Sequence, residues 1–190
     1  MASAEDGAGG FWVFGYGSLM WNPGFDYLER RMARLHGFHR AFALASIRYR
    51  GTPEAPGLVL GLDWAPGAQC VGMVFRVCPS RADWVRGYLH DRELVNRSYF
   101  EVVYPVDLLG PDGTAEDRID AICYVLDRTH PQYRGRLPLD EQAAVIARAR
   151  GPRGPNADYL HATVAQLAEI GVEDAELRDL DRRVRALAGE

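Results

Sequence analysis

A short stretch near the N-terminus, in which a strand runs directly into a glycine turn, constrains the fold most. It reads Phe11-Trp-Val-Phe-Gly-Tyr-Gly-Ser-Leu-Met20. Aromatic and β-branched residues favour a pleated, half-buried surface, so the first half predicts a strand. Gly15 and Gly17 allow positive φ and a close approach to the backbone. Free N–H groups in such a turn bind anions and developing oxyanions. The stretch therefore predicts the floor of a small-molecule site.

Better-known glycine loops do not match this turn. A phosphate loop requires Gly-Lys-Ser/Thr, and no lysine lies nearby. A dinucleotide fingerprint requires a third glycine, and a nucleophile elbow requires glycine two residues after the serine, but Met20 stands at both positions. We therefore do not predict that Ser18 is a hydrolase nucleophile. A hairpin turn without a ligand stays open as the alternative.

Composition restricts the class of protein. The 190 residues predict one domain, over residues 11–190, preceded by a disordered tail of small, polar residues 1–10. With 22 basic and 26 acidic residues the net charge is −4, so we expect no nucleic-acid partner. No run approaches the ~18 apolar residues of a membrane helix, so we expect no membrane partner. Three cysteines without CxxC spacing predict reduced thiols in a cytoplasmic protein.

The order of the predicted elements, with strands first and helices later, favours an α+β fold with a largely antiparallel sheet or barrel. We expect a short helical turn at 25–32, a turn at 65–67, a hairpin turn at 111–113 and a functional loop at 48–57. Ser80, Asn156 and Asp174 are the expected helix caps. The predicted strands are 11–14, one or two within 33–47, 58–62, 71–77, 99–106 and 118–126, and the predicted helices are 80–93, 139–150 and those that begin at 156 and 174.

The helix predicted over 80–93 carries two candidate acids. Val85 and Leu89 mark its apolar face, and Asp91 and Glu93 fall near opposite edges of that face. Either carboxylate can reach a cleft beside the core, and periodicity does not choose between them. A solvated carboxylate at a helix end is the ordinary alternative for both.

Several ordered motifs resemble the ChaC family of γ-glutamylcyclotransferases. The resemblance extends from about Trp12 into the final helix. Its motifs are Phe14-Gly-Tyr-Gly-Ser-Leu19 with Trp21-Asn-Pro-Gly24, Arg50-Gly-Thr-Pro-Glu54, Tyr88-Leu with Asp91-Arg-Glu93, Pro138-Leu, and Gly154-Pro-Asn156 with Tyr159-Leu160.

The resemblance implies an activity and a fold. Members of this family act on glutathione and release 5-oxoproline and cysteinylglycine without a metal or cofactor. Their fold is a mixed, largely antiparallel β-barrel flanked by helices. The expected partner is thus a small-molecule substrate, glutathione or a related γ-glutamyl peptide. His36 and His39 are three residues apart on a predicted strand without further clustered ligands, so they do not predict a metal site.

Residue roles also follow from the resemblance. Glu93 matches the catalytic glutamate of the family, which selects it over Asp91. Arg50 and Tyr159 match motif positions that line the same pocket. The loop whose backbone holds the γ-glutamyl group corresponds to Tyr16, Gly17, Ser18 and Leu19.

One departure from the family pattern follows the glutamate. Many members have Lys and a Gly-Tyr pair there, whereas this chain has Leu94-Val-Asn-Arg-Ser-Tyr99. Tyr99 is the candidate replacement for that tyrosine. The departure keeps open a different γ-glutamyl amine or dipeptide as substrate. A non-catalytic module that binds a γ-glutamyl ligand or regulates a partner is the other alternative.

Overall fold

The computed structural model describes residues 10–94 and 97–189. Apart from Gly10, the predicted tail over residues 1–10 lies outside the described residues. The chain divides into two compact units. Unit 1 contains the described residues up to Arg40 together with Leu62–Asp127, and unit 2 contains Ala41–Gly61 and the described residues from Arg128 onward. The single domain over 11–190 stays a prediction.

Five strands form one mixed, largely antiparallel sheet, which together with the helices confirms the α+β prediction. The strand order is β1-β3-β2-β4-β5. Strand β1 pairs antiparallel with β3 and parallel with β5, and β4 pairs antiparallel with both β2 and β5. The strands are β1 (Phe11–Gly15), β2 (Glu29–Ser46), β3 (Gly57–Val77), β4 (Tyr99–Leu109) and β5 (Ala115–Leu126).

Strand β1 lies in the core of unit 1, as its composition predicts. All five of its residues are buried, and Val13 pairs with Phe75 on one side and Ile122 on the other. A strand with neighbours on both edges and side chains packed on both faces needs apolar residues throughout, rather than an alternating pattern. This is why aromatic and β-branched residues occupy successive positions of β1 up to Gly15.

Two predictions on the first strands are wrong. No helical turn forms at 25–32, where the chain is irregular until β2 begins at Glu29. Phe25 instead packs its ring edge-on against Phe75, with ring centroids 6.0 Å apart. The predicted turn at 65–67 is part of the continuous strand β3. Pro66 lies in an exposed part of that strand, where the missing N–H costs little.

Helix α1 (Ala82–Glu93) lies in unit 1 and follows a 3₁₀ turn, η2 (Pro79–Arg81). Its Val85 and Leu89 are fully buried, as the periodicity predicts. The predicted cap is wrong: α1 has no side-chain cap, and the Ser80 hydroxyl lies 3.1 Å from the Cys78 sulfur instead. The side chain that the capping rule assigns to the helix start is thus used by the preceding turn.

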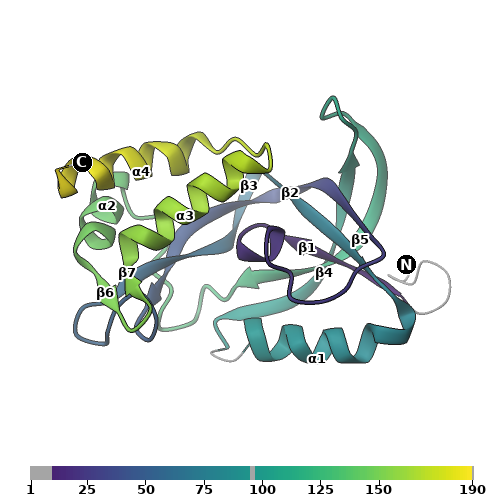
Figure 1. Ribbon diagram of the computed structural model, residues 1–190, viewed down its shortest axis with the longest axis horizontal. Coiled ribbons are helices and arrows are strands. Elements are labelled where there is room, and N and C mark those ends of the chain that lie inside the picture. The colour runs from purple at the N-terminus through teal and green to yellow at the C-terminus, as the bar shows by residue number, and fades with distance from the viewer. Residues whose placement is uncertain (1–9, 95–96, 190) are drawn as a thin grey trace. The chain divides into compact units, whose positions relative to one another are not determined.

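Unit 2 contains three helices that contact one another (Figure 1). Asp174 caps α4 by accepting a hydrogen bond from the Leu177 amide at 3.1 Å, as predicted. The apolar stripe of α4 is buried up to Val184, but Leu187 is exposed. The elements are α2 (Leu139–Arg148), α3 (Asn156–Glu169) and α4 (Ala175–Ala188), with the short strands β6 (Arg150–Gly151) and β7 (Gly154–Pro155) between α2 and α3.

The predicted cap at Asn156 is also wrong. The N-cap of α3 is Pro155, and no side chain caps the helix. The Asn156 side chain is fully buried, accepts a hydrogen bond from the Leu58 amide at 2.6 Å and donates one to the Leu58 carbonyl at 2.8 Å. It therefore completes the hydrogen bonding of the β3 backbone at the start of that strand.

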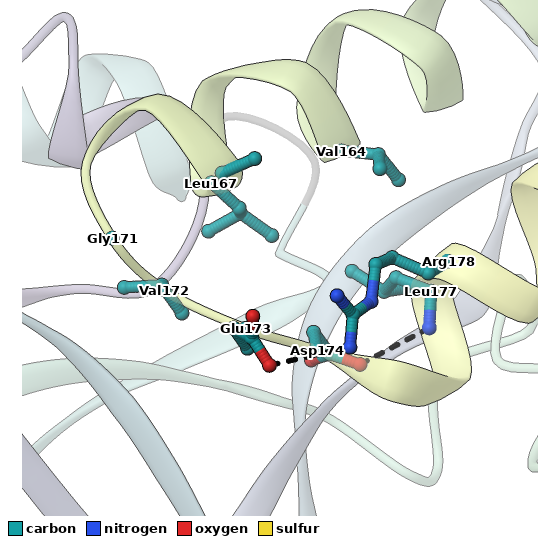
Figure 2. Close-up of a pocket in the computed structure, with 9 residues that line it drawn as sticks. Val164, Leu167, Gly171, Val172, Glu173, Asp174, Leu177 and Arg178 are labelled. Atoms are coloured by element: carbon teal, nitrogen blue, oxygen red, sulfur yellow. Dashed lines mark hydrogen bonds and ion pairs between the residues drawn. The ribbon is translucent and has the colours of Figure 1, made fainter.

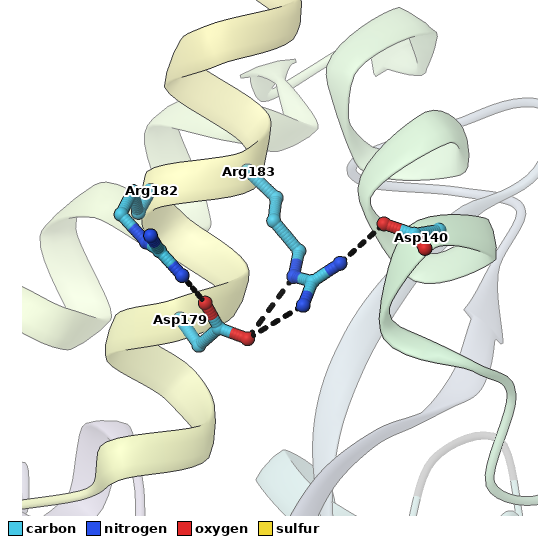
Figure 3. A network of polar contacts seen from close by, with 4 residues as sticks. All are labelled: Asp140, Asp179, Arg182 and Arg183. Carbon is cyan, nitrogen blue, oxygen red and sulfur yellow. Dashed lines mark hydrogen bonds and ion pairs between the residues drawn. The ribbon is translucent and has the colours of Figure 1, made fainter.

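A charged network on the surface links α2 to α4 (Figure 3). The Arg183 guanidinium donates to both Asp140 and Asp179, and Asp179 also accepts from Arg182. The hydrogen bond from Arg182, followed by that from Arg183, lowers the pKa of Asp179. Exposed pairs of this kind contribute little stability, so the network indicates a solvated helix face rather than a binding site.

Among the described residues, no helix is long and apolar enough to cross a membrane.

Candidate active site

Glu93 lies at the C-terminal end of α1 and is mostly withdrawn from solvent. Its side chain is 18% exposed, whereas Asp91 is exposed. Burial raises the pKa of the Glu93 carboxyl, and the positive charge of Arg92 opposes this rise without cancelling it. A carboxylate with a raised pKa is a better base near neutral pH than an ordinary glutamate. Of the two candidate acids, Glu93 has the environment of a general base.

The glycine turn folds into a 3₁₀ turn, η1 (Ser18–Met20), directly after β1. Gly15 permits this because a Cβ there would lie 3.0 Å from the Leu19 Cβ. Within the turn, the Met20 amide donates to the Gly17 carbonyl at 2.8 Å.

The first amides of this turn point to a ligand. Across residues 10–94 and 97–189, the amides of Gly17, Ser18 and Leu19 have no hydrogen-bond acceptor. Gly17 and Leu19 are buried, and backbone amides in such positions normally have an acceptor. Three successive amides without an acceptor among the described residues are what the predicted anion cradle requires, and the cradle itself stays a prediction.

Two arginines hold the turn in place, and sequence reasoning missed both. Arg40 is buried and donates from Nε to the Tyr16 carbonyl at 3.0 Å. Arg92 donates to the Ser18 hydroxyl at 2.9 Å and to the Asn22 carbonyl at 2.8 Å. Because the guanidinium groups occupy carbonyl and hydroxyl oxygens, they leave the amides of the turn free. No local sequence signal identifies either arginine, because these acceptors are distant from both in sequence.

A second cluster lies near Glu93. The buried Tyr124 hydroxyl donates to Glu101 at 2.9 Å, and His90 lies 3.3 Å from the same carboxylate oxygen. Burial raises the pKa of Tyr124, and the charges of Glu101 and Glu93 raise it further. The hydroxyl therefore stays protonated and acts as a donor. Sequence reasoning missed Tyr124, whose burial on β5 depends on tertiary packing.

Tyr99 is the tyrosine that sequence reasoning nominated. It begins β4, is half-buried and pairs with Leu126 in the β4–β5 ladder. The segment that precedes it contains residues 95–96, which lie outside the described residues. Its assignment to the substrate site stays a prediction.

Arg50 and Tyr159 lie together in unit 2. The Arg50 guanidinium carbon is 5.6 Å from the centroid of the Tyr159 ring, in cation–π geometry. Arg50 Nη1 donates to the carbonyls of Arg153 at 2.7 Å and Pro155 at 3.1 Å. The ring of Phe42 contacts Tyr159 edge-on at 5.7 Å. The structure thus brings these two predicted residues together and orients the arginine with two backbone carbonyls.

Cys123, Ser18 and the potential metal ligands lack a suitable setting. The hydrogen bond with Ser80 lowers the pKa of the Cys78 thiol, but no sequence motif singles out this cysteine. Burial raises the pKa of the Cys123 thiol, which disfavours its thiolate. The Ser18 hydroxyl accepts from Arg92, a group that cannot serve as a base. In the part of the chain that the structure describes, no three His, Cys, Asp or Glu side chains are grouped to hold a metal. The three cysteines are free thiols, as predicted.

A cavity of about 190 Å³ lies between α3 and α4 in unit 2 (Figure 2). Leu167 and Leu177 are among its apolar lining residues, and the ion pair of Glu173 with Arg178, at 3.3 Å, lies at its edge. It contains none of the predicted site residues. Its lining offers no acid–base pair suited to the predicted chemistry, so we assign the candidate site to Glu93 and the η1 turn.

Comparisons with known proteins show the family of this chain. Residues 11–187 match the family described as ChaC-like protein. The glutathione-specific γ-glutamylcyclotransferase of Escherichia coli (strain K12) is 35% identical over 182 residues, which cover 96% of this chain and 76% of that protein. γ-Glutamylcyclotransferase 2-3 of Arabidopsis thaliana is 31% identical over 183 residues, covering 94% and 90%. The crystal structure of a γ-glutamylcyclotransferase specific to glutathione from yeast superposes with a TM-score of 0.83 at 27% identity, covering 94% of this chain and 96% of that one.

Proposed function

Since the chain belongs to the ChaC-like family, we propose that it is a γ-glutamylcyclotransferase that acts on glutathione and releases 5-oxoproline and cysteinylglycine. One observation carries the proposal: Arg92 forms an ion pair with Glu93 and a hydrogen bond with the Ser18 hydroxyl, so it connects Glu93 to the η1 turn. A base and a row of free amides are the two elements that this reaction requires. We infer glutathione as the substrate from the relatives that are named as specific to glutathione.

The proposed reaction is intramolecular. The α-amine of the γ-glutamyl group attacks its own γ-carbonyl carbon, a C–N bond forms, and the amide bond to cysteine breaks. The enzyme has to hold the substrate in a curled conformation, and such orientation can supply several kcal/mol of the barrier. No water is consumed, so the two products together have the mass of glutathione.

Glu93 is the proposed base. The substrate amine is protonated at neutral pH and becomes nucleophilic only after it loses a proton. Burial raises the pKa of Glu93 toward the working pH, which improves the match between base and amine. The carboxylate accepts this proton and then delivers it to the leaving nitrogen of cysteine as the amide bond breaks. The attacking nitrogen loses one further proton to solvent when the lactam forms, and the released amine of cysteinylglycine takes one up, so the protons balance.

The η1 turn is the proposed oxyanion cradle. When the amine attacks, the γ-carbonyl oxygen gains negative charge and needs fixed donors. Gly17, Ser18 and Leu19 present amides without an acceptor among the described residues. We include Tyr16 with this loop and Tyr99 with the substrate-binding residues, on the strength of the motif resemblance.

Arg50 and Tyr159 are proposed to bind the substrate. A guanidinium pairs with a carboxylate in a two-pronged fork, and glutathione carries two carboxylates. Nη1 of Arg50 is held by two backbone carbonyls, and the Tyr159 ring supports the guanidinium plane. Such preorganisation lowers the entropic cost of binding.

We also infer that the sheet closes into a barrel and that the protein works in the cytoplasm. Closure is supported by β1, which is paired on both edges within the order β1-β3-β2-β4-β5. Three free thiols favour a reducing compartment.

The proposal is tested by incubating purified protein with glutathione and separating the products by mass spectrometry. We expect 5-oxoproline and cysteinylglycine, without incorporation of oxygen from H₂¹⁸O. Free glutamate carrying ¹⁸O would instead indicate hydrolysis and would contradict the mechanism.

A panel of γ-glutamyl dipeptides and amines tests substrate choice. The panel is included because the segment after Glu93 differs from the family pattern. Turnover of another member of the panel in preference to glutathione would identify a different cyclotransferase. Binding across the panel without turnover would indicate a ligand-binding module.

A further inference from the structure

Arg92 connects the two parts of the candidate site. Its side chain is only 20% exposed. On the side of the glycine turn, Nη2 donates to the Ser18 hydroxyl at 2.9 Å, and Nη1 donates to the carbonyls of Asn22 at 2.8 Å and Pro23 at 3.2 Å. These acceptors belong to the turn that presents the free amides and to the segment that leaves it.

On the side of the helix, the same guanidinium contacts the proposed base. Nε lies 3.1 Å from Oε1 of Glu93, and Nη1 lies 2.9 Å from the Tyr88 hydroxyl. Tyr88 is fixed in turn, because its ring stacks on Trp84 with the planes 6° apart. All three nitrogens of the guanidinium are therefore engaged, and its planar shape fixes the angle between helix and turn.

We propose that Arg92 is a positioning residue, which sets the distance and orientation of the Gly17–Leu19 amides relative to the Glu93 carboxylate. This inference rests on the proposed function. Within residues 10–94 and 97–189, no hydrogen bond or ion pair joins Glu93 directly to the turn, whereas Arg92 is bonded to both. A shift of about 1 Å between base and oxyanion donors can reduce turnover roughly 10²-fold.

Arg92 also acts on the charge of Glu93. Its guanidinium lowers the pKa of Glu93, against the larger effect of burial. The other titratable groups nearby are Tyr88 on α1, whose hydroxyl accepts a hydrogen bond from Arg92, Tyr124 on β5, Glu101 on β4 and His90 on α1. Because Tyr88→Phe removes the titratable hydroxyl that contacts Arg92, comparison with that variant assigns a change in the titration of Glu93 to the guanidinium.

Two substitutions separate position from charge. Arg92→Lys keeps the positive charge but loses the planar fork, so we expect kcat to fall roughly 10²-fold while the acid limb of the kcat/KM profile stays in place. Arg92→Gln loses both, so we expect a similar fall together with a shift of that limb to higher pH. Arg81→Gln is the matched control, because Arg81 stacks on Trp84 at the start of α1 and, among the described residues, has no hydrogen bond or ion pair with Glu93 or the turn.

A direct titration keeps the inference testable without activity. Carboxyl ¹³C NMR of labelled glutamate, assigned by comparison with Glu93→Gln, gives the titration midpoint of Glu93. We expect Arg92→Gln to raise this midpoint and Arg92→Lys and Arg81→Gln to leave it unchanged. If Arg92→Gln does not fold, Tyr88→Phe, which removes one acceptor of Arg92, is expected to lower kcat without moving the midpoint.

The outcomes distinguish the two proposals. If the wild type turns over glutathione and the Arg92 variants match it in kcat and in the midpoint of Glu93, the positioning role is overturned. An equal loss of thermal stability and of activity in both variants, without a difference in pH profile between them, would also overturn it. A wild type that is inactive on every γ-glutamyl compound contradicts the proposed function, whereas the NMR titration still decides how Arg92 acts on Glu93.

Discussion

Replacing Asn156 tests how the segment around Gly57 is held at the start of β3. The fully buried Asn156 amide accepts from the Leu58 N–H at 2.6 Å and donates to the Leu58 carbonyl at 2.8 Å. A Cβ at Gly57 would lie 2.6 Å from Oδ1 of Asn156, so the backbone packs directly on this amide. Asn156→Ala removes both hydrogen bonds, whereas Asn156→Asp removes only the donor.

The two substitutions have different expected magnitudes. A buried polar group left without a partner costs about 1–3 kcal/mol. Asn156→Ala orphans both the N–H and the C=O of Leu58, so we expect a loss of about 2–6 kcal/mol in the free energy of unfolding. This is a large share of the 5–15 kcal/mol that is typical of a folded domain.

Asn156→Asp adds a dependence on pH. The introduced carboxyl is buried and faces the Leu58 carbonyl, so its folded-state pKa rises above the ordinary value of about 3.9. A group with a raised folded-state pKa stabilises the fold fully below its unfolded-state pKa, and this contribution is lost as the pH rises. The deficit relative to wild type is therefore expected to be small near pH 4 and to grow toward pH 7.

Urea unfolding at pH 4 to 7 measures both effects, with Asp158→Asn as a control. Asp158 is an exposed residue in the first turn of the same helix, so its substitution is expected to change the free energy of unfolding by less than about 0.5 kcal/mol. A stability of Asn156→Ala equal to wild type would refute the structural role of Asn156. If the loss in free energy of unfolding of Asn156→Asp does not depend on pH, the argument that the introduced carboxyl faces the Leu58 carbonyl without a donor and has a raised pKa is refuted.

Three further predictions concern the site. Burial raises the pKa of Glu93, so the wild type loses stability relative to Glu93→Gln as the pH rises above about 4.3. Thermal melts in which the stability difference between the two proteins does not change from pH 4 to pH 7 would contradict this. Gly24→Ala places an alanine at φ 77°, which costs about 1–2 kcal/mol, and its Cβ would lie 2.0 Å from the Tyr88 hydroxyl. We therefore expect a lower melting temperature and lower turnover, and an unchanged melting temperature would refute the close contact. Ser18→Ala is expected to lower turnover by no more than roughly tenfold, because the exposed hydroxyl is one of several acceptors of Arg92. Complete loss of turnover together with a trapped acyl-enzyme would instead identify a serine nucleophile.

Local patterns predict the fold well where one face of an element decides its structure. The run at Phe11–Gly15 and the apolar stripe of α1 each follow from burial. The hairpin turn at Pro111-Asp-Gly113 also forms, with Gly113 at φ 77°. The Asp174 cap of α4 follows from a short-range hydrogen bond that no distant group contests.

Prediction fails where a distant partner uses the same side chain. Asn156 bonds to Leu58, although the capping rule assigns it to α3. The Leu28 amide donates to the Arg76 carbonyl at 2.8 Å, which favours extended chain over the helical turn expected at 25–32. In each case a contact between residues far apart in sequence outweighs a local preference.

The candidate site divides in the same way. Motifs single out Glu93 and the glycine turn, and burial of Glu93 is consistent with the proposed base. Arg92 and Tyr124 could not be assigned from their neighbours in sequence, because their partners come from the turn after β1 and from β4. Those contacts require the tertiary structure.

The turnover of glutathione by Glu93→Gln, with Asp91→Asn as the matched control, tests the central claim most directly. Both substitutions remove one carboxylate from the end of α1, but Asp91 is exposed and Glu93 is not. We predict that Glu93→Gln lowers kcat roughly 10²–10⁴-fold, with binding of glutathione retained, and that Asp91→Asn stays close to wild type. A folded Glu93→Gln variant with wild-type turnover would contradict the assignment of Glu93 as the base.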